Sequence, residues 1–239
     1  MSSETLIGGA LAGIEPRPGV PAVIGRRSRV AVVALAPVIL LAAFVAHPYT
    51  GFGPPDEVAI AEAAASSTSR WGISHLLTGV AAALLILAFL AIRSYLREAG
   101  DQLWSARGIP FVAFGGTLYA MLPGIEFAVL AAAETGGDVQ AAQAAVEPWF
   151  VPVIVVSGVT SATGIMCFAI GVWRMGPSVL KIPRFVIVAL GVMALSRVVP
   201  LTAVQFYVHA VAALTAFWPL AYVMWRYSRT MRSVGPASG

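Results

Sequence analysis

The clearest indication of the fold is an apolar run at residues 114–133, FGGTLYAMLPGIEFAVLAAA. Its length and apolar character are those of an α-helix that crosses a ~30 Å hydrocarbon core. Glu126 lies inside this run, where a charge costs at least ~2.5–3.5 kcal/mol on insertion scales, so we expect it to have a partner. Pro123 and Gly124 come just before it, and we predict a structural kink there. Because proline has no N–H, the carbonyl of Tyr119 is left free near the carboxylate.

The whole chain carries too little charge to cover a water-facing surface. Of its 239 residues, 59% are hydrophobic and 11% are charged, whereas a soluble domain has about 25% charged residues. Long apolar runs recur along the chain, and they lack the short alternating pattern of a β-barrel. We therefore predict an all-α polytopic membrane protein, with the lipid bilayer as its first partner.

Six apolar runs predict a bundle of six transmembrane helices. They cover residues 30–46, 73–92, 110–133, 150–173, 183–202 and 206–225, so that 30–226 is the membrane domain and 1–29 and 227–239 are flexible cytoplasmic tails. Basic residues gather in alternate connections and acidic residues in the others. The positive-inside rule then places both termini in the cytoplasm of a bacterial cell, with the protein in its inner membrane. Since topology accounts for the basic residues, they do not indicate nucleic-acid binding.

The two longer outer connections resemble each other. PPDEVAIAEAAASS (54–67) and GGDVQAAQAAVEPW (136–149) each contain an aspartate in a helix-capping position, Asp56 or Asp138, followed by an alanine-rich run. We predict that each connection forms a short helix on the extracytoplasmic surface.

The fourth predicted span carries a row of small residues: Ser157, Ser161, Gly164 and Gly171. Small residues let a neighbouring helix approach closely. The row marks a packing face inside the bundle, or one between subunits in a homo-oligomer or with a partner membrane subunit.

Polar groups inside the membrane gather toward its outer side. Glu126 lies about 10 Å below the outer end of the third span, and Arg197 about 7–8 Å below that of the fifth. Opposite charges at similar depth predict an ion pair, although Arg197 could also extend to the outer surface. We place His75 and His209 at the rim of the same cluster, at the outer ends of the second and sixth spans.

These residues support several functions. The first is a small-ligand or proton-coupled transport site that opens outward, built from Glu126, Arg197, His75, His209 and Tyr119. The second is a redox module in which His75 and His209 ligate a b-type haem. A metal site of two histidines and Glu126 is a third arrangement, and an accessory subunit without chemistry is a fourth.

Known enzyme signatures are missing from the sequence. No HExxH, GxSxG or P-loop motif is present, so we do not expect an enzyme. The only lysine, Lys181, falls in a cytoplasmic connection, which disfavours a retinal protein.

Two segments carry a resemblance to known proteins. HPYTGFGPPDE (47–57) follows the first span, and RWGISHLLTGVAAALLILAFLAI (70–92) surrounds the second. In layout the chain resembles a broad class of small polytopic bacterial membrane proteins whose chemistry is unassigned. The resemblance implies a membrane location and no particular activity.

Overall fold

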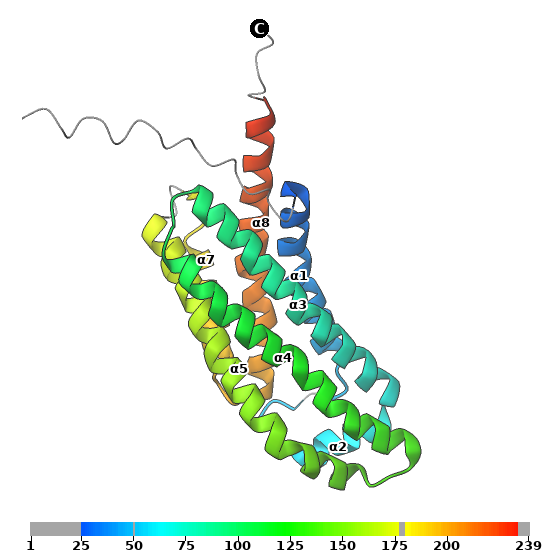
Figure 1. The fold of residues 1–239 in the computed structure, drawn as a ribbon. Helices are drawn as coiled ribbons and strands as arrows, with labels where there is room; N and C mark the ends of the chain where they lie inside the picture. The colour runs from blue at the N-terminus through cyan, green and yellow to red at the C-terminus, as the bar shows by residue number, and fades with distance from the viewer. Residues whose placement is uncertain (1–24, 50, 177–179, 234–239) are drawn as a thin grey trace, which may run out of the picture.

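The computed structural model describes residues 25–49, 51–176 and 180–233, and every regular element in them is helical. Of the predicted flexible tails, residues 1–24 and 234–239 lie outside the described residues, whereas residues 26–29 belong to α1 and 227–233 to α8. The helices are α1 (Arg26–Ala46), α2 (Glu57–Ser66), α3 (Thr68–Glu98), α4 (Trp104–Thr135), α5 (Val139–Met175), α7 (Phe185–Ser196), the π-helical turn η1 (Val204–Val208) and α8 (His209–Ser233) (Figure 1). The all-α prediction is confirmed.

In the part of the chain that the structure describes, five helical segments have the length and apolar composition that crossing a membrane requires. They are α1, α3, α4, α5 and the continuous segment formed by η1 and α8. The predicted fifth span, 183–202, contains only α7, which is 12 residues long. The chain therefore has the character of a multi-pass membrane protein, with one apolar helix shorter than the others.

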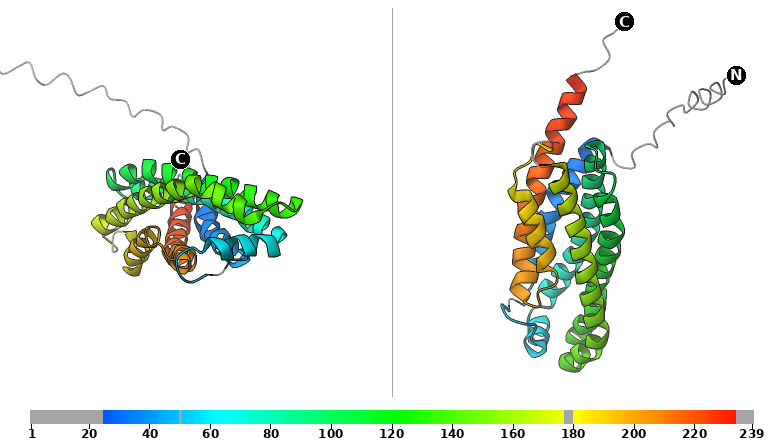
Figure 2. Two further views of the ribbon diagram at one scale, coloured as in Figure 1. Left: turned by 90° about the horizontal axis from the view of Figure 1, so that it is seen from below. Right: turned by 90° about the vertical axis from the view of Figure 1, so that its left-hand side faces the viewer.

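The helices form a closed ring in two layers. Each packs against the next in the order α1, α3, α4, α5, α7, α8 and back to α1. Seen along the bundle, α3, α4 and α5 make one curved layer, and α1, α8 and α7 make the other (Figure 2). The start of α1 and the end of α8 lie at one end of the bundle, and α2 lies at the opposite end.

Aromatic side chains hold the two layers together. Phe89 of α3 packs between Phe168 of α5 and Phe217 of α8, with ring centroids 4.8 Å and 5.2 Å away. All three rings are buried. A smaller apolar cluster at the α2 end unites Ala64, Trp71, Val129 and Val146, so α2 is packed onto the bundle.

The row of small residues on α5 packs against α4. A Cβ atom added at Gly164 would lie 2.7 Å from the backbone N of Val112 and 2.9 Å from the carbonyl O of Gly108. The Ser157 hydroxyl donates to the carbonyl of Gly115 at 2.8 Å. This row is therefore a packing face inside the bundle, the first of the two predicted alternatives, because the backbones of α4 and α5 meet there.

Both predicted helix caps are present, but only one of the two short helices is separate. Asp56 accepts hydrogen bonds from the N–H groups of Val58 and Ala59, and Asp138 accepts one from Ala141. The first cap opens the short helix α2. The second opens α5, which continues for 37 residues through Pro148 and Pro152, so the prediction of a second separate helix is wrong. A proline removes one helical hydrogen bond, and here the helix continues past that loss.

The helix α4 also continues without a break through two prolines, Pro110 and Pro123. The predicted kink at Pro123 and Gly124 stays a prediction.

The close approach of α4 and α5 predicts that Gly164→Ala destabilises the protein. The added methyl group would press against backbone atoms that cannot move aside, and overpacking of this kind costs about 1–3 kcal/mol. Gly191→Ala on α7 is the matched control, because nothing lies within 4 Å of its added Cβ and alanine favours helix by about 1 kcal/mol. Thermal unfolding in detergent should therefore show a lower midpoint for Gly164→Ala alone. Equal midpoints would contradict the close approach.

Candidate functional site

A cavity of about 400 Å³ lies at the α2 end of the bundle. That volume falls within the range of about 300–1,000 Å³ in which proteins bind small ligands. Its walls come from α1, α2, α3, α4, α5 and η1 and from the segments that follow α1 and α7. Aromatic, ionisable and other polar side chains line much of it, among them Phe44, His47, Tyr49, Glu57, Trp71, His75, Tyr119, Glu126, Gln143, Glu147, Phe150, Thr202 and Phe206.

Glu126 and His75 form a hydrogen-bonded pair in this cavity. Their Oε2 and Nε2 atoms are 2.6 Å apart. The other ring nitrogen of His75, Nδ1, lies 2.7 Å from the carbonyl oxygen of Trp71. A carbonyl oxygen only accepts hydrogen bonds, so Nδ1 carries a hydrogen.

This arrangement fixes one proton between the two side chains. With Nδ1 protonated, the contact between Nε2 and Oε2 needs a hydrogen that belongs either to the imidazolium of His75 or to the carboxylic acid of Glu126. Without it, two lone pairs would face each other at 2.6 Å. The pair is thus a proton-holding group on the wall of a cavity.

Arg197 does not pair with Glu126, contrary to the ion pair predicted from their depths. Among the described residues its guanidinium lies over the ring of Tyr119, with Cζ 4.2 Å from the ring centroid. Arg197 is only 7% exposed, so it does not extend to the surface either. The ring face attracts the cation, and His75 satisfies the carboxylate. Similar depth did not bring the charges together because depth leaves open which side of a helix each one occupies.

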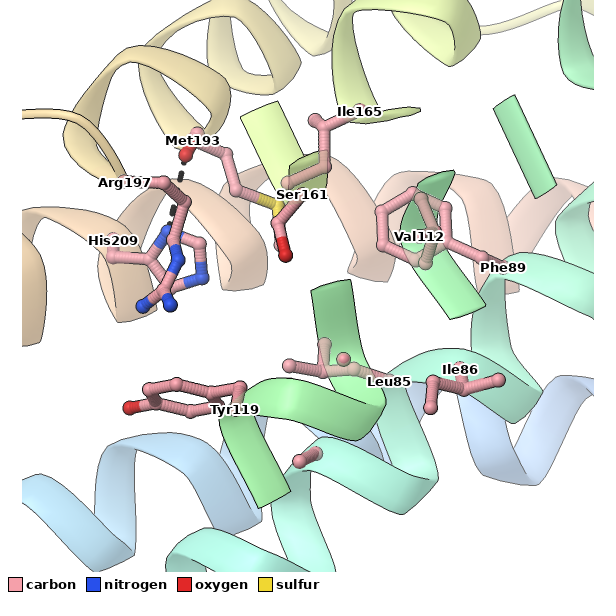
Figure 3. A pocket seen from close by; sticks show the side chains of 12 residues that line it. Leu85, Ile86, Phe89, Val112, Tyr119, Ser161, Ile165, Met193, Arg197 and His209 are labelled. Carbon is pink, nitrogen blue, oxygen red and sulfur yellow. Dashed lines mark hydrogen bonds between the residues drawn. The ribbon is translucent and has the colours of Figure 1, made fainter. Parts of the chain in front are cut away.

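His209 lies in a second, smaller cavity of about 30 Å³ that Arg197, Met193 and Tyr119 also line. Its Nδ1 atom is 3.1 Å from the carbonyl oxygen of Met193 and 2.9 Å from the Ser196 hydroxyl. Figure 3 shows His209 and Arg197 together across the cavity from Tyr119. The structure therefore brings His209 to Arg197 and does not bring it to the cavity of His75.

This separation does not fit a haem held by His75 and His209. The two side chains line different cavities, one of which has room for about a single water molecule. Both ring nitrogens of His75 are also already engaged. In the described part of the chain, no group of three or more His, Cys, Asp or Glu side chains is arranged to hold a metal ion, so the metal hypothesis lacks a third ligand there.

His47 also lines the large cavity, although it is not among the site residues predicted from the sequence. It ends α1, and its ring centroid lies 5.2 Å from that of His75 and 5.1 Å from that of Trp71. Burial, reinforced by the neighbouring His75 imidazole, lowers the pKa of His47 to about 4. His47 is therefore neutral at physiological pH, and it adds an aromatic surface to the cavity without adding charge.

Buried polar atoms without partners are concentrated in the large cavity. Five such side-chain atoms occur among the described residues, and three of them line this cavity: Trp71 Nε1, Gln143 Oε1 and Thr202 Oγ1. These residues are 1%, 6% and 6% exposed. Buried polar atoms are normally paired, and each unpaired one costs about 1–3 kcal/mol. Residues that carry unpartnered polar atoms are thus gathered around this cavity.

Sequence reasoning had little signal for these three residues. Gln143 lies in an alanine-rich run, 136–149, for which the sequence predicts a surface helix, and Trp71 is in no candidate site predicted from the sequence. Only the packing of α5 against the rest of the bundle turns Gln143 inward.

Two further acidic residues lie at the cavity, Glu57 on α2 and Glu147 on α5. A side-chain hydrogen bond with Glu147, together with repulsion from its charge, raises the pKa of Glu57. Glu57 is exposed, so the cavity reaches the surface of the molecule beside α2.

Comparisons with protein-family models, with curated proteins and with solved structures find no match to this chain. The function of the protein is therefore inferred from the geometry of the cavity.

The contact between His75 and Glu126 predicts that alanine substitutions at these two positions have coupled effects on the free energy of unfolding. Each single alanine variant leaves the other buried group without its partner, so the double variant should lose less stability than the sum of the two by about 1.5–3 kcal/mol. The measurement is a double-mutant cycle of unfolding free energies in detergent. Glu126→Ala combined with Thr117→Ala provides the control, because the Thr117 hydroxyl bonds only within its own helix and about two turns away. Additive effects for His75 and Glu126 would show that the pair does not form.

Proposed function

We propose that this protein is a multi-pass membrane protein that binds a small ligand in the cavity beside α2, with the pair of His75 and Glu126 as its polar anchor. One observation carries the proposal: three residues that each carry an unpartnered buried polar atom, together with a proton-holding pair, line a single cavity of about 400 Å³. If the cavity were only a packing defect, we would not expect residues with unsatisfied polar atoms to be concentrated around it.

The proposed topology has six crossings, with both termini in the cytoplasm and the protein in the bacterial inner membrane. A 12-residue helix such as α7 spans about 18 Å, so residues 197–208, which include η1, would complete the fifth crossing and begin the sixth. Support comes from α1 starting and α8 ending at the same end of the bundle, which requires an even number of crossings. The positive-inside rule assigns that end to the cytoplasm. Then α2 is an extracytoplasmic surface helix and the cavity opens outward.

Cysteine labelling tests this orientation. In a Cys167→Ser background, Glu134→Cys places a thiol at the α2 end, and Gln102→Cys places one in the connection at the opposite end; both positions are exposed. A membrane-impermeant maleimide should label position 134 in intact cells and position 102 only after permeabilisation. The reverse pattern would invert the topology and make the cavity open to the cytoplasm.

Proton coupling is part of the proposal. A positively charged or hydrogen-bond-donating ligand that engages the Glu126 carboxylate would take the place of the proton that the carboxylate shares with His75. Binding would then release a proton, which is the exchange that a proton-coupled transporter needs.

A substitution of Gln143 distinguishes a role in ligand binding from a role in packing. Replacing it with methionine removes the unpartnered buried carbonyl while keeping the length of the side chain, so we expect Gln143→Met to raise the unfolding midpoint of the protein without ligand, by an amount that corresponds to about 1–3 kcal/mol. The same variant should weaken the stabilisation that a bound ligand provides. Gln140→Met, one turn away and exposed, is the matched control and should change neither.

The measurement is thermal unfolding in detergent with a panel of small amphiphiles of each charge class. If no member of the panel stabilises the wild type, the binding proposal fails, and the accessory-subunit hypothesis takes its place. A stoichiometric membrane partner recovered after mild solubilisation would favour that outcome directly.

A further inference from the structure

We infer that the ligand of this cavity is a small organic cation, an ammonium group that carries an apolar body and one hydrogen-bond acceptor. The inference rests on the proposed function and adds the chemical class of the ligand.

The charged side chains that line the cavity are all acidic. They are Glu57, Glu126 and Glu147, and no lysine or arginine is among the described residues of its wall. The nearest guanidinium groups are directed elsewhere. Arg197 lies on the ring of Tyr119 in the neighbouring cavity, and Arg70 is exposed and donates to the carbonyl of Ala46 at 3.2 Å. A cation therefore meets carboxylates on the wall, whereas an anion meets no lysine or arginine there and only a histidine that Glu126 already engages.

Aromatic side chains make up much of the remaining wall. They come from several elements and are Phe44, Tyr49, Trp71, Tyr119, Phe150 and Phe206, with the neutral ring of His47 beside them. Phe44 and Phe206 stack with their centroids 4.5 Å apart and present one continuous apolar surface. The faces of aromatic rings attract cations, and enclosures of such rings recognise quaternary ammonium groups.

The unpartnered polar atoms agree with this ligand class and extend it. Gln143 is more than nine-tenths buried, and the partial negative charge of its unpartnered carbonyl oxygen, Oε1, attracts an ammonium group whether or not that group has an N–H. The Thr202 hydroxyl can do the same. Trp71 Nε1–H is a donor only, so it needs an acceptor on the ligand, such as a hydroxyl or ether oxygen. An amino alcohol satisfies both requirements.

A cation beside Glu126 competes with the proton that the carboxylate shares with His75. The affinity for the cation should therefore rise with pH, as the proton becomes easier to displace. The other titratable or charged groups that face the pair or the cavity are His47, Tyr49, Glu57, Tyr119 and Glu147, with Arg70 and Arg197 beyond them. His47 remains neutral above pH 5 because its pKa is about 4, so it does not supply this dependence.

Three probes of the same shape test the inference on the full-length protein in detergent. Choline is the cation, the alcohol in which carbon replaces its nitrogen is the neutral isostere, and tert-butylacetate is the anion. We expect choline alone to raise the unfolding midpoint, with an affinity that rises with pH because binding releases a proton. Glu126→Gln should lower that affinity by about tenfold or more and remove its pH dependence. The control, Glu62→Gln on the exposed face of α2, should change neither.

The outcomes separate this inference from the proposed function. Equal stabilisation by choline and its neutral isostere, or preference for the anion, would overturn the cation inference and leave ligand binding in place. Choline binding that is unchanged in Glu126→Gln would also overturn it, because the carboxylate would then play no part. If none of the three probes binds and the amphiphile panel also fails, both proposals fall together.

Discussion

The contact between His75 Nε2 and Glu126 Oε2 is the interaction on which the rest of the site depends. A carboxylate inside an apolar bundle needs a partner that satisfies its charge or takes part in its protonation. The Trp71 carbonyl supplies the missing constraint, because it holds the hydrogen of His75 on Nδ1 and so leaves a single proton between the imidazole and the carboxylate. A polar pair of this kind can lie on a cavity wall, since its internal hydrogen bond satisfies the carboxylate while no ligand is bound.

The close packing of α4 against α5 contrasts with the open space that the large cavity leaves at the α2 end of the bundle. Small residues let the two backbones meet around Gly108 and Gly164, and the Ser157 hydroxyl bonds across the interface. Nearer the α2 end, the side chains between the layers are larger and include the rings of Trp71 and Phe206, and these rings line the cavity instead of filling it. The tight contact and the cavity therefore lie at successive levels along α5.

The two embedded charges show how membrane burial can be satisfied in different ways. Glu126 forms a short hydrogen bond to an imidazole, whereas Arg197 lies against the face of Tyr119. Tyr119 lines both cavities, so its ring separates the acidic site from the arginine. This separation leaves the large cavity without a lysine or arginine among its described residues, and the ligand class inferred above follows from that electrostatic asymmetry.

The sequence by itself determined the helical class, the apolar segments, the caps at Asp56 and Asp138 and the importance of Glu126, because hydrophobic length, capping chemistry and the cost of a buried charge are local properties. Only the tertiary structure decided that His75, 51 residues away, is the partner of Glu126, that Arg197 faces Tyr119, and that Gln143 turns inward. The physical reason is that depth along a helix follows from residue number, while the rotation of each helix is set by its packing against neighbours distant in the sequence.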